Sequence, residues 1–248
     1  MRVHATQIAE SDSNGWFLTI CAWGVHLYTA MGAIFGLLAI RYAAVGDFRA
    51  SFIAMAITIV IDSSDGTLAR FVNVKKRVPE FDGALLDNIV DYLTYVVAPV
   101  FLVMWAGLVT GPLGLAVAAF VLIASAYQFC QTNAKTPDNF FLGFPSYWNI
   151  VAFYLFCLRL SAPVNELILS AFALMVFIPI KYIYPSRTKP LRPLTLTLGL
   201  IWAVVTVAML PSLPSYNPIL LYASLAYVAY YFIASFALHA RALLTQPA

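Results

Sequence analysis

The chain has 248 residues, of which 62% are hydrophobic and only 10% are charged, and its mean hydropathy is +0.85. Soluble domains carry about 25% charged residues, so this composition excludes an ordinary soluble protein and predicts an all-α, polytopic membrane bundle. The net charge of +3 is small. The short basic run Lys75, Lys76 and Arg77 is better explained by anchoring at lipid headgroups than by nucleic-acid binding.

The apolar runs, taken in chain order, predict about eight membrane spans, because a helix needs about 20 apolar residues to cross the hydrocarbon. The first run follows a polar segment and is too long for the apolar region of a signal peptide, so we expect it to remain as a helix. We treat the chain as one membrane domain, 1–248. The predicted spans are 17–40, 48–70, 84–107, 112–130, 147–160, 164–183, 194–211 and 217–238.

The loops between these spans sort by charge. With the N-terminus in the cytoplasm, Arg41, Arg49 and Arg159 are the basic residues on the outer side. The positive-inside rule therefore favours cytoplasmic termini. The basic residues on the inner side are then Arg2, Arg70, Lys75, Lys76, Arg77, Lys135, Lys181, Arg187, Lys189, Arg192 and Arg241.

Four aspartates interrupt the apolar helical runs between residues 62 and 91. Each charged group in a membrane helix costs about 2.5–3.5 kcal/mol on insertion scales, and Arg70 is the one base of the stretch in phase with them. Carboxylates gathered without bases indicate a hard divalent cation such as Mg²⁺ or Mn²⁺. Two helix faces carry the pattern: Asp62, Asp65, Gly66, Ala69 and Arg70 on the first, and Gly83, Asp87 and Asp91 on the second.

The order Asp62-x2-Asp65-Gly66-x2-Ala69-Arg70, then Gly83-x3-Asp87-x3-Asp91, resembles the signature of the CDP-alcohol phosphotransferase family. The spacer from Phe71 to Asp82 has twelve residues, whereas most of that family has eight. The longer spacer is similar to that of the bacterial phosphatidylcholine synthase branch, as is the run from Asn139 to Asn149.

The resemblance implies a role for each residue of the motif. Asp62, Asp65, Asp87 and Asp91 would bind one or two Mn²⁺ or Mg²⁺ ions, and these ions would hold the pyrophosphate of CDP-diacylglycerol. Asp91 would also be the general base that takes the hydroxyl proton of choline, which would yield phosphatidylcholine and CMP. The residues that would contact the CDP-lipid are Gly66, Ala69, Arg70 and Gly83.

Thr29 in the first span also matches the resembled family, as a contact of the nucleotide. His26 stands where that family has an asparagine. We expect it to be a buried neutral histidine with a hydrogen-bond partner rather than a metal ligand, because the acids already supply enough oxygens.

Choline carries a quaternary ammonium, which donates no hydrogen bond and is held by aromatic ring faces and carboxylates. The candidate rings are Tyr95, one turn beyond Asp91, together with Tyr127, Tyr147 and Trp148. For the rings of the segment 131–149, an aromatic belt at the membrane interface is the simpler explanation.

Several alternatives stay open at this point. The same chemistry would serve another acceptor, such as serine, glycerol phosphate or inositol phosphate, or a CDP-alcohol donor. A cation transporter or a lipid-binding membrane module would also place acids in a bundle. The resemblance further implies an active site on the cytoplasmic face of a bacterial inner membrane, contact with membrane phospholipids, and the homodimer common in that family.

Overall fold

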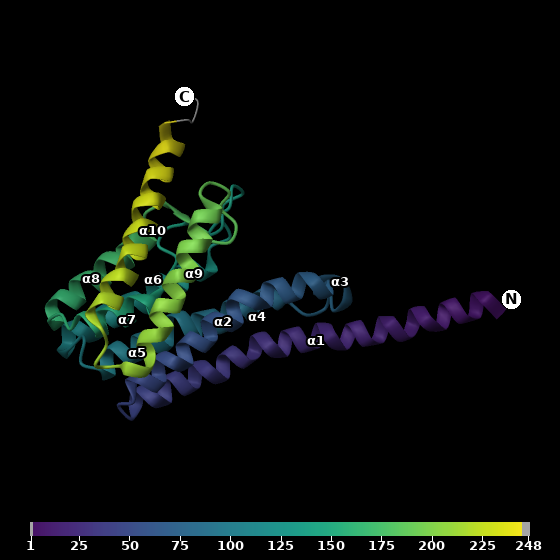
Figure 1. Ribbon diagram of the computed structural model, residues 1–248, viewed down its shortest axis with the longest axis horizontal. Helices are drawn as coiled ribbons and strands as arrows, with labels where there is room; N and C mark the ends of the chain where they lie inside the picture. Colours follow the sequence, from purple (N-terminus) through teal and green to yellow (C-terminus); the bar gives the residue numbers. More distant parts are fainter. Residues whose placement is uncertain (1, 245–248) are drawn as a thin grey trace.

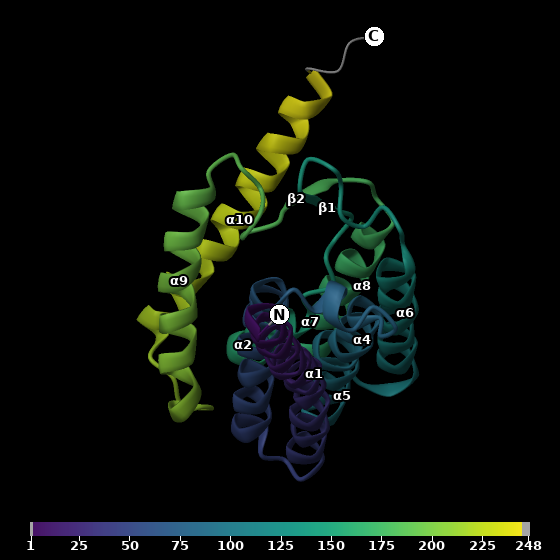
Figure 2. The same ribbon diagram turned by 90° about the vertical axis from the view of Figure 1, so that its right-hand side faces the viewer.

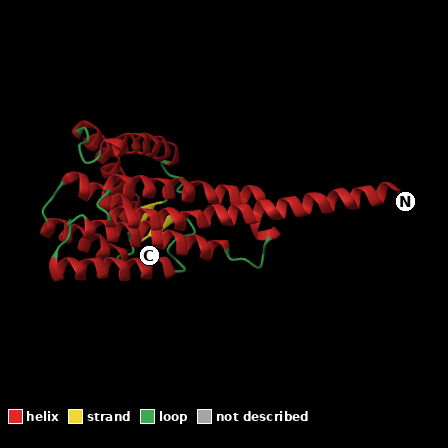
Figure 3. Cartoon of the chain, turned by 90° about the horizontal axis from the view of Figure 1, so that it is seen from below, coloured by secondary structure: helices red, strands yellow, loops and turns green. Residues whose placement is uncertain are grey.

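The computed structural model describes the backbone of residues 2–244 and the side chains of residues 15–244, and it is almost entirely helical (Figures 1 and 3). The two termini, whose side of the membrane is predicted above, lie outside the described residues. In chain order the elements are α1 Arg2–Ala44, α2 Phe48–Val72, α3 Val74–Arg77, α4 Gly83–Asp91, the π-helix η1 Tyr92–Val97, α5 Ala98–Trp105, α6 Gly111–Cys130, β1 Phe140–Leu142, α7 Trp148–Leu158, α8 Ala162–Val176, β2 Lys181–Ile183, α9 Arg192–Met209, the 3₁₀ turn η2 Leu210–Ser212 and α10 Pro218–Leu244.

The predicted polytopic membrane bundle is confirmed. Within the described residues, six helical segments are long and apolar enough to cross a membrane, and α7 and α8 are shorter apolar helices. The outer surface of α9 exposes Leu200, Ile201 and Val204 by more than half of their area. Contiguous apolar surface of this kind faces lipid rather than water. The chain is therefore an integral membrane protein.

Helices α1 and α2 form an antiparallel hairpin (Figure 1). The turn between them uses Gly46, whose φ of +80° suits a residue without a Cβ. Asp47 caps α2 by accepting a hydrogen bond from the amide of Ala50 at 2.9 Å. Farther along, the Ser51 hydroxyl donates to the Ala39 carbonyl at 2.7 Å and ties the two helices together. The hairpin thereby fixes the position of the α2 aspartates along the axis of α1.

The third span changes helix type at its middle. Asp82 caps α4, since its carboxylate accepts hydrogen bonds from the amides of Ala84 and Leu85, each at 3.0 Å. In the sequence Asp82 is out of phase with Asp87 and Asp91, which predicts a helix N-terminal role rather than a place among the ligands, and the cap confirms that role. Directly after Asp91 the backbone becomes the π-helix η1 and then continues as α5. The wider π turn shifts the side chains that follow Asp91 away from their α-helical positions, and such insertions are frequent at functional sites.

Close packing brings α1 against this interrupted span. A Cβ placed on Gly32 would lie 2.7 Å from Cγ1 of Val90, and one on Gly36 would lie 3.1 Å from Cγ2 of Thr94. Small residues at these positions let two membrane helices approach closely, as the sequence predicts. The acids of α4 are thereby held beside those of α2.

The remaining elements form the larger hydrophobic core and frame the site. Figure 2 shows α9 and α10 on one side of the bundle and α6 and α8 on the other. A small antiparallel ribbon joins the two sides: β1 pairs with β2, with Phe141 opposite Tyr182. The sequence did not predict this ribbon. It divides the predicted span 164–183, because α8 ends at Val176 and the last three residues of that range are β2.

Candidate metal centre and active site

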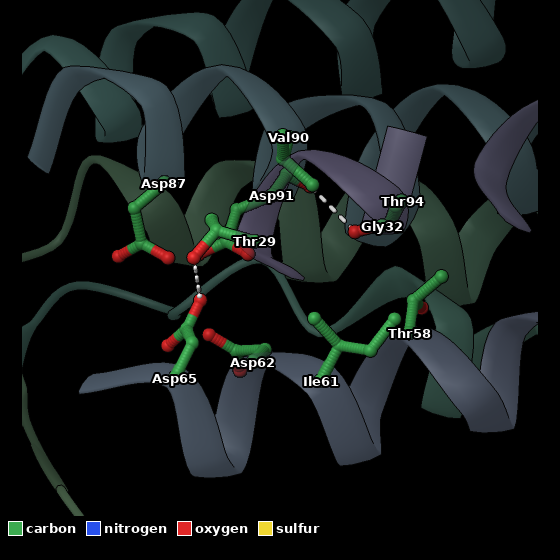
Figure 4. A pocket seen from close by; sticks show the side chains of 10 residues that line it. All are labelled: Thr29, Gly32, Thr58, Ile61, Asp62, Asp65, Asp87, Val90, Asp91 and Thr94. Atoms are coloured by element: carbon green, nitrogen blue, oxygen red, sulfur yellow. Dashed lines mark hydrogen bonds between the residues drawn. The ribbon is translucent and has the colours of Figure 1, made fainter. Parts of the chain in front are cut away.

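The aspartates of α2 and α4 converge across the helix interface. Asp62, Asp87 and Asp91 each offer a carboxylate oxygen, and these three oxygens lie within 4.8 Å of one another. Asp65 lines the same recess, so all four predicted ligands face one space (Figure 4). The recess has an empty volume of about 190 Å³ and is lined by Thr29, Gly32, Thr58, Ile61, Asp62, Asp65, Asp87, Val90, Asp91 and Thr94.

Two hydroxyl groups orient the acids of α2. The Thr29 hydroxyl donates to Oδ2 of Asp65 at 2.8 Å, and the Tyr95 hydroxyl donates to Oδ2 of Asp62 at 2.7 Å. Each bond involves Oδ2 of its carboxylate. Partners of this kind fix the direction of carboxylates that bind metals. Thr29 and Tyr95 therefore each meet an acid of the recess, contacts that the sequence did not specify, and the predicted contact of Thr29 with the nucleotide stays a prediction.

The donor set fits a hard divalent cation. The described residues form one salt bridge, between Lys181 and Asp138 at 2.7 Å. None of the four acids of the recess therefore has a described basic side chain within ion-pairing distance. Clustered carboxylate oxygens without such a partner are the ligands that Mg²⁺ and Mn²⁺ prefer. The cluster of Asp62, Asp87 and Asp91 could therefore bind a metal ion, with Asp65 at its edge.

Sequence reasoning missed one charged residue at this site. Lys135, on the loop between α6 and β1, interacts electrostatically with Asp62, Asp87 and Asp91 although it makes no ion pair with them. Its backbone bridges to Phe141, which anchors the loop to the ribbon. Lys135 lies 44 residues after Asp91 in the sequence, and no helical periodicity connects the two.

The same ribbon is tied down by the exposed ion pair of Lys181 with Asp138. Partial burial of Asp138 acts to raise its pKa, but the hydrogen bonds from Lys181 and Thr136 and the positive charge of Lys181 together outweigh that effect and hold the pKa below its usual value. The ribbon and the loop carrying Lys135 are therefore fixed to each other at their outer edge.

The small residues of the motif are not equivalent in the structure. A Cβ on Gly66 would meet only Nη1 of Arg70, at an ordinary 3.5 Å, so the space beside Gly66 is open. A Cβ on Gly83 would lie 2.6 Å from Cε1 of His26, so Gly83 is needed for helix packing. Ala69 packs beside the small apolar cluster between α1 and α3.

Arg70 points along its own helix and donates from Nη2 to the Thr67 hydroxyl at 3.0 Å. His26 is buried, as predicted, and its ring lies 4.5 Å from that of Phe81. Its Nε2 nevertheless has no hydrogen-bond partner among the described residues. The hydrogen bond predicted for this histidine is therefore missing at Nε2, and the neighbours of the imidazole include the aromatic rings of Trp23 and Phe81.

Comparison with known proteins decides the family. No family model matches the chain. It is 42% identical to the phosphatidylcholine synthase of Legionella pneumophila over 222 residues, which is 87% of each chain. It is 49% identical to that of Legionella bozemanae over 73% of this chain and 87% of the relative, and 40% identical to that of Borreliella burgdorferi over 76% and 80%. The chain belongs to the phosphatidylcholine synthase family. The resemblance to CDP-alcohol phosphotransferases, and to this branch of them, is thereby confirmed.

In this member of the phosphatidylcholine synthase family, the four aromatic residues predicted to bind choline do not lie together. Tyr95 and Tyr147 are neighbours, with ring centroids 6.2 Å apart. Trp148 is buried in the core and donates from Nε1 to the Ser125 hydroxyl at 2.6 Å. Tyr127 packs on Phe177 at 5.0 Å and is about half exposed. The structure thus brings Tyr95 and Tyr147 beside the acids and places Trp148 and Tyr127 elsewhere.

Proposed function

We propose that the chain transfers the phosphatidyl group of CDP-diacylglycerol to choline and so makes phosphatidylcholine and CMP. The observation that carries this proposal is the convergence of Asp62, Asp87 and Asp91 within 4.8 Å in a membrane-embedded recess. The names of the relatives supply the substrate class, since phosphatidylcholine is built from a choline acceptor and a lipid donor. Family membership favours this enzyme over the transporter hypothesis.

The resident cation would be Mn²⁺ or Mg²⁺, in one or two copies, held by Asp62, Asp87 and Asp91 with Asp65 beside them. Bound there, it would neutralise charge on the diphosphate oxygens of the donor. Thr29 and Tyr95 would keep Asp65 and Asp62 directed into the recess through their hydrogen bonds.

The chain's own residues would then divide the remaining work. Asp91 accepts the proton of the choline hydroxyl while the oxygen of that hydroxyl forms a bond to the phosphorus that carries diacylglycerol. The bond from that phosphorus to the bridging oxygen breaks, and CMP leaves with that oxygen. Gly66 leaves space for the CDP moiety, and Lys135 and Arg70 place positive charge near the phosphates.

The test is an assay of the purified protein in detergent with CDP-diacylglycerol, Mn²⁺ and a panel of alcohols. We expect CMP release that depends on choline and a lipid product containing choline. CMP release with serine, glycerol phosphate or inositol phosphate but not with choline would reassign the acceptor. No CMP with any alcohol, together with cation flux in liposomes, would indicate a transporter.

The open space at Gly66 makes a separate prediction. Gly66→Ala adds a methyl group that the protein itself accommodates, so the thermal midpoint should stay within about 2 °C of the wild type. The same methyl group intrudes on the CDP-lipid, so KM for CDP-diacylglycerol should rise about tenfold or more. Gly24→Ala, a matched change at a helical glycine with nothing within 4 Å, should leave both quantities unchanged. An unaltered KM in Gly66→Ala would remove Gly66 from the donor site.

Orientation and assembly complete the proposal. We place both termini and the acid recess on the cytoplasmic side of a bacterial inner membrane, supported by the excess of lysine and arginine in the loops of that side. The basic helix α3 lies next to α1 on this side. A single membrane domain over 1–248 and a homodimer stay predictions.

A further inference from the structure

Aromatic rings from three separate elements gather around Tyr147, the residue that precedes α7. Its ring centroid lies 6.2 Å from Tyr95 of η1, 6.2 Å from Phe141 of β1 and 6.5 Å from Tyr231 of α10. The planes are inclined to that of Tyr147 by 48°, 89° and 59°, so the rings stand around it rather than in one stack. Phe141 and Tyr147 are six residues apart, whereas Tyr95 and Tyr231 come from distant parts of the sequence, and the fold brings all four together.

This ring cluster adjoins the acid recess. Tyr95 donates its hydroxyl to Asp62, and Tyr147 interacts electrostatically with both Asp62 and Asp91. The Tyr147 side chain is only partly buried. Tyr147 therefore belongs to a ring cluster that adjoins the negative charge of the aspartates.

Two neighbouring rings, unlike that of Tyr147, are already covered by basic side chains of the protein. The ammonium of Lys181 lies over Phe140 at 5.6 Å, and the guanidinium of Arg187 lies over Tyr184 at 5.6 Å. Among the described residues no basic side chain lies over Tyr95, Phe141, Tyr147 or Tyr231. The described basic side chains thus leave these four ring faces uncovered beside the carboxylates of the recess.

The rings are also held in place before any ligand binds. The Tyr231 hydroxyl donates to the Ile183 carbonyl at 3.0 Å, and Phe141 is stacked on Tyr184 at 4.4 Å. Phe141 is further fixed by the pairing of β1 with β2. Rigid aromatic walls lose little conformational entropy on binding, which favours affinity for a small ligand.

We propose that Tyr147, with Phe141 and Tyr231, forms the binding site for the trimethylammonium group of the acceptor, with Tyr95 as its wall toward the metal centre. The assignment of choline as that acceptor rests on the function proposed above. A trimethylammonium group donates no hydrogen bonds and is attracted by ring faces and nearby carboxylates. Its hydroxyl is only two carbons from the nitrogen, so the ring site must adjoin the base, and Tyr147 is near Asp91.

The site explains selection between acceptors. Ethanolamine and serine carry primary ammonium groups, which are strongly hydrated and lose hydrogen bonds when they enter an aromatic enclosure. Choline has no such bonds to lose. The ring cluster should therefore discriminate in favour of the fully methylated amine.

The test compares Tyr147→Leu with Tyr147→Phe and measures KM for each substrate separately. Loss of one desolvated ring should raise KM for choline about tenfold, as expected for a cation–π contact, while KM for CDP-diacylglycerol stays within about twofold. Tyr147→Phe keeps the ring and should stay near the wild type. Tyr222→Leu, on the exposed face of α10, is the control that changes a tyrosine outside the cluster.

Phe141→Leu is the second variant, used if Tyr147→Leu does not fold, and it should show the same selective rise. A binding measurement makes the result independent of the activity. Calorimetry with tetramethylammonium should detect binding to the wild type and to Tyr147→Phe, and a loss of about tenfold or more in Tyr147→Leu or Phe141→Leu.

The outcomes separate the two proposals. If choline supports no CMP release but tetramethylammonium binds and depends on Tyr147, the acceptor is wrong and the ring site stands. If choline is the acceptor but the ring variants leave its KM unchanged, or raise both KM values equally, the ring site is wrong. Absence of tetramethylammonium binding to the wild type also overturns it.

Discussion

Replacement of Asp91 by Asn is expected to lower kcat by about 10²–10⁴-fold, the contribution of a positioned general base. The amide has nearly the size of the carboxylate, so it fills the same place in the recess, but it cannot accept the proton of the choline hydroxyl. Asp91 lies within 4.8 Å of the oxygens of Asp62 and Asp87 and ends α4 just before the π-helix. The measurement is CMP release from CDP-diacylglycerol and choline by the purified variant.

Asp138→Asn is the matched control for this change. It removes a carboxylate of the same type from an exposed ion pair outside the recess, and such pairs contribute at most about 1 kcal/mol. Its kcat should be close to that of the wild type. A folded, membrane-inserted Asp91→Asn protein that keeps wild-type kcat would contradict the role of Asp91 as base.

The local part of this site could be predicted because it is periodic. Asp62 and Asp65 fall on one helical face, and Asp87 and Asp91 on another, so spacing alone places each pair. Apolar runs likewise located the six long spans, whereas the predicted spans 147–160 and 164–183 are shorter helices in the structure. The capping role of Asp82 followed from its position one residue before the helix.

The parts that could not be predicted depend on contacts between distant segments. Lys135 comes near the acids on an irregular loop, and Phe141 comes near Tyr147 on a three-residue strand, and neither segment has a periodic pattern. Tyr231 joins the cluster from α10, where its sequence neighbours are also aromatic and apolar. The π-helix after Asp91 has no signal in the residues Tyr92 to Val97, since packing against α1 and α6 rather than local propensity shapes it.

Divalent cations are expected to raise the thermal midpoint of the wild-type protein by several degrees. A ligand at 100 times its Kd stabilises a protein by about 2.7 kcal/mol, and about 2–4 °C per kcal/mol is usual for a chain of this size. The physical reason is that Asp62, Asp65, Asp87 and Asp91 crowd one small recess without an ion-paired base. The measurement is the unfolding midpoint in detergent with Mn²⁺ or Mg²⁺ and with EDTA.

The variant Asp87→Asn tests whether the acids bind the cation, because its stability relative to the wild type should change direction between EDTA and Mn²⁺. In EDTA the variant should be at least as stable as the wild type, because it removes one of several carboxylates that repel one another at short distance. In Mn²⁺ it should be less stable than the wild type, because it has lost a ligand. The order of the two midpoints should therefore reverse between the two buffers, whereas Asp138→Asn should respond to Mn²⁺ as the wild type does. If the acids had only a structural role, the order would not reverse, because loss of a buried aspartate needed for packing would lower the thermal midpoint equally with and without the ion.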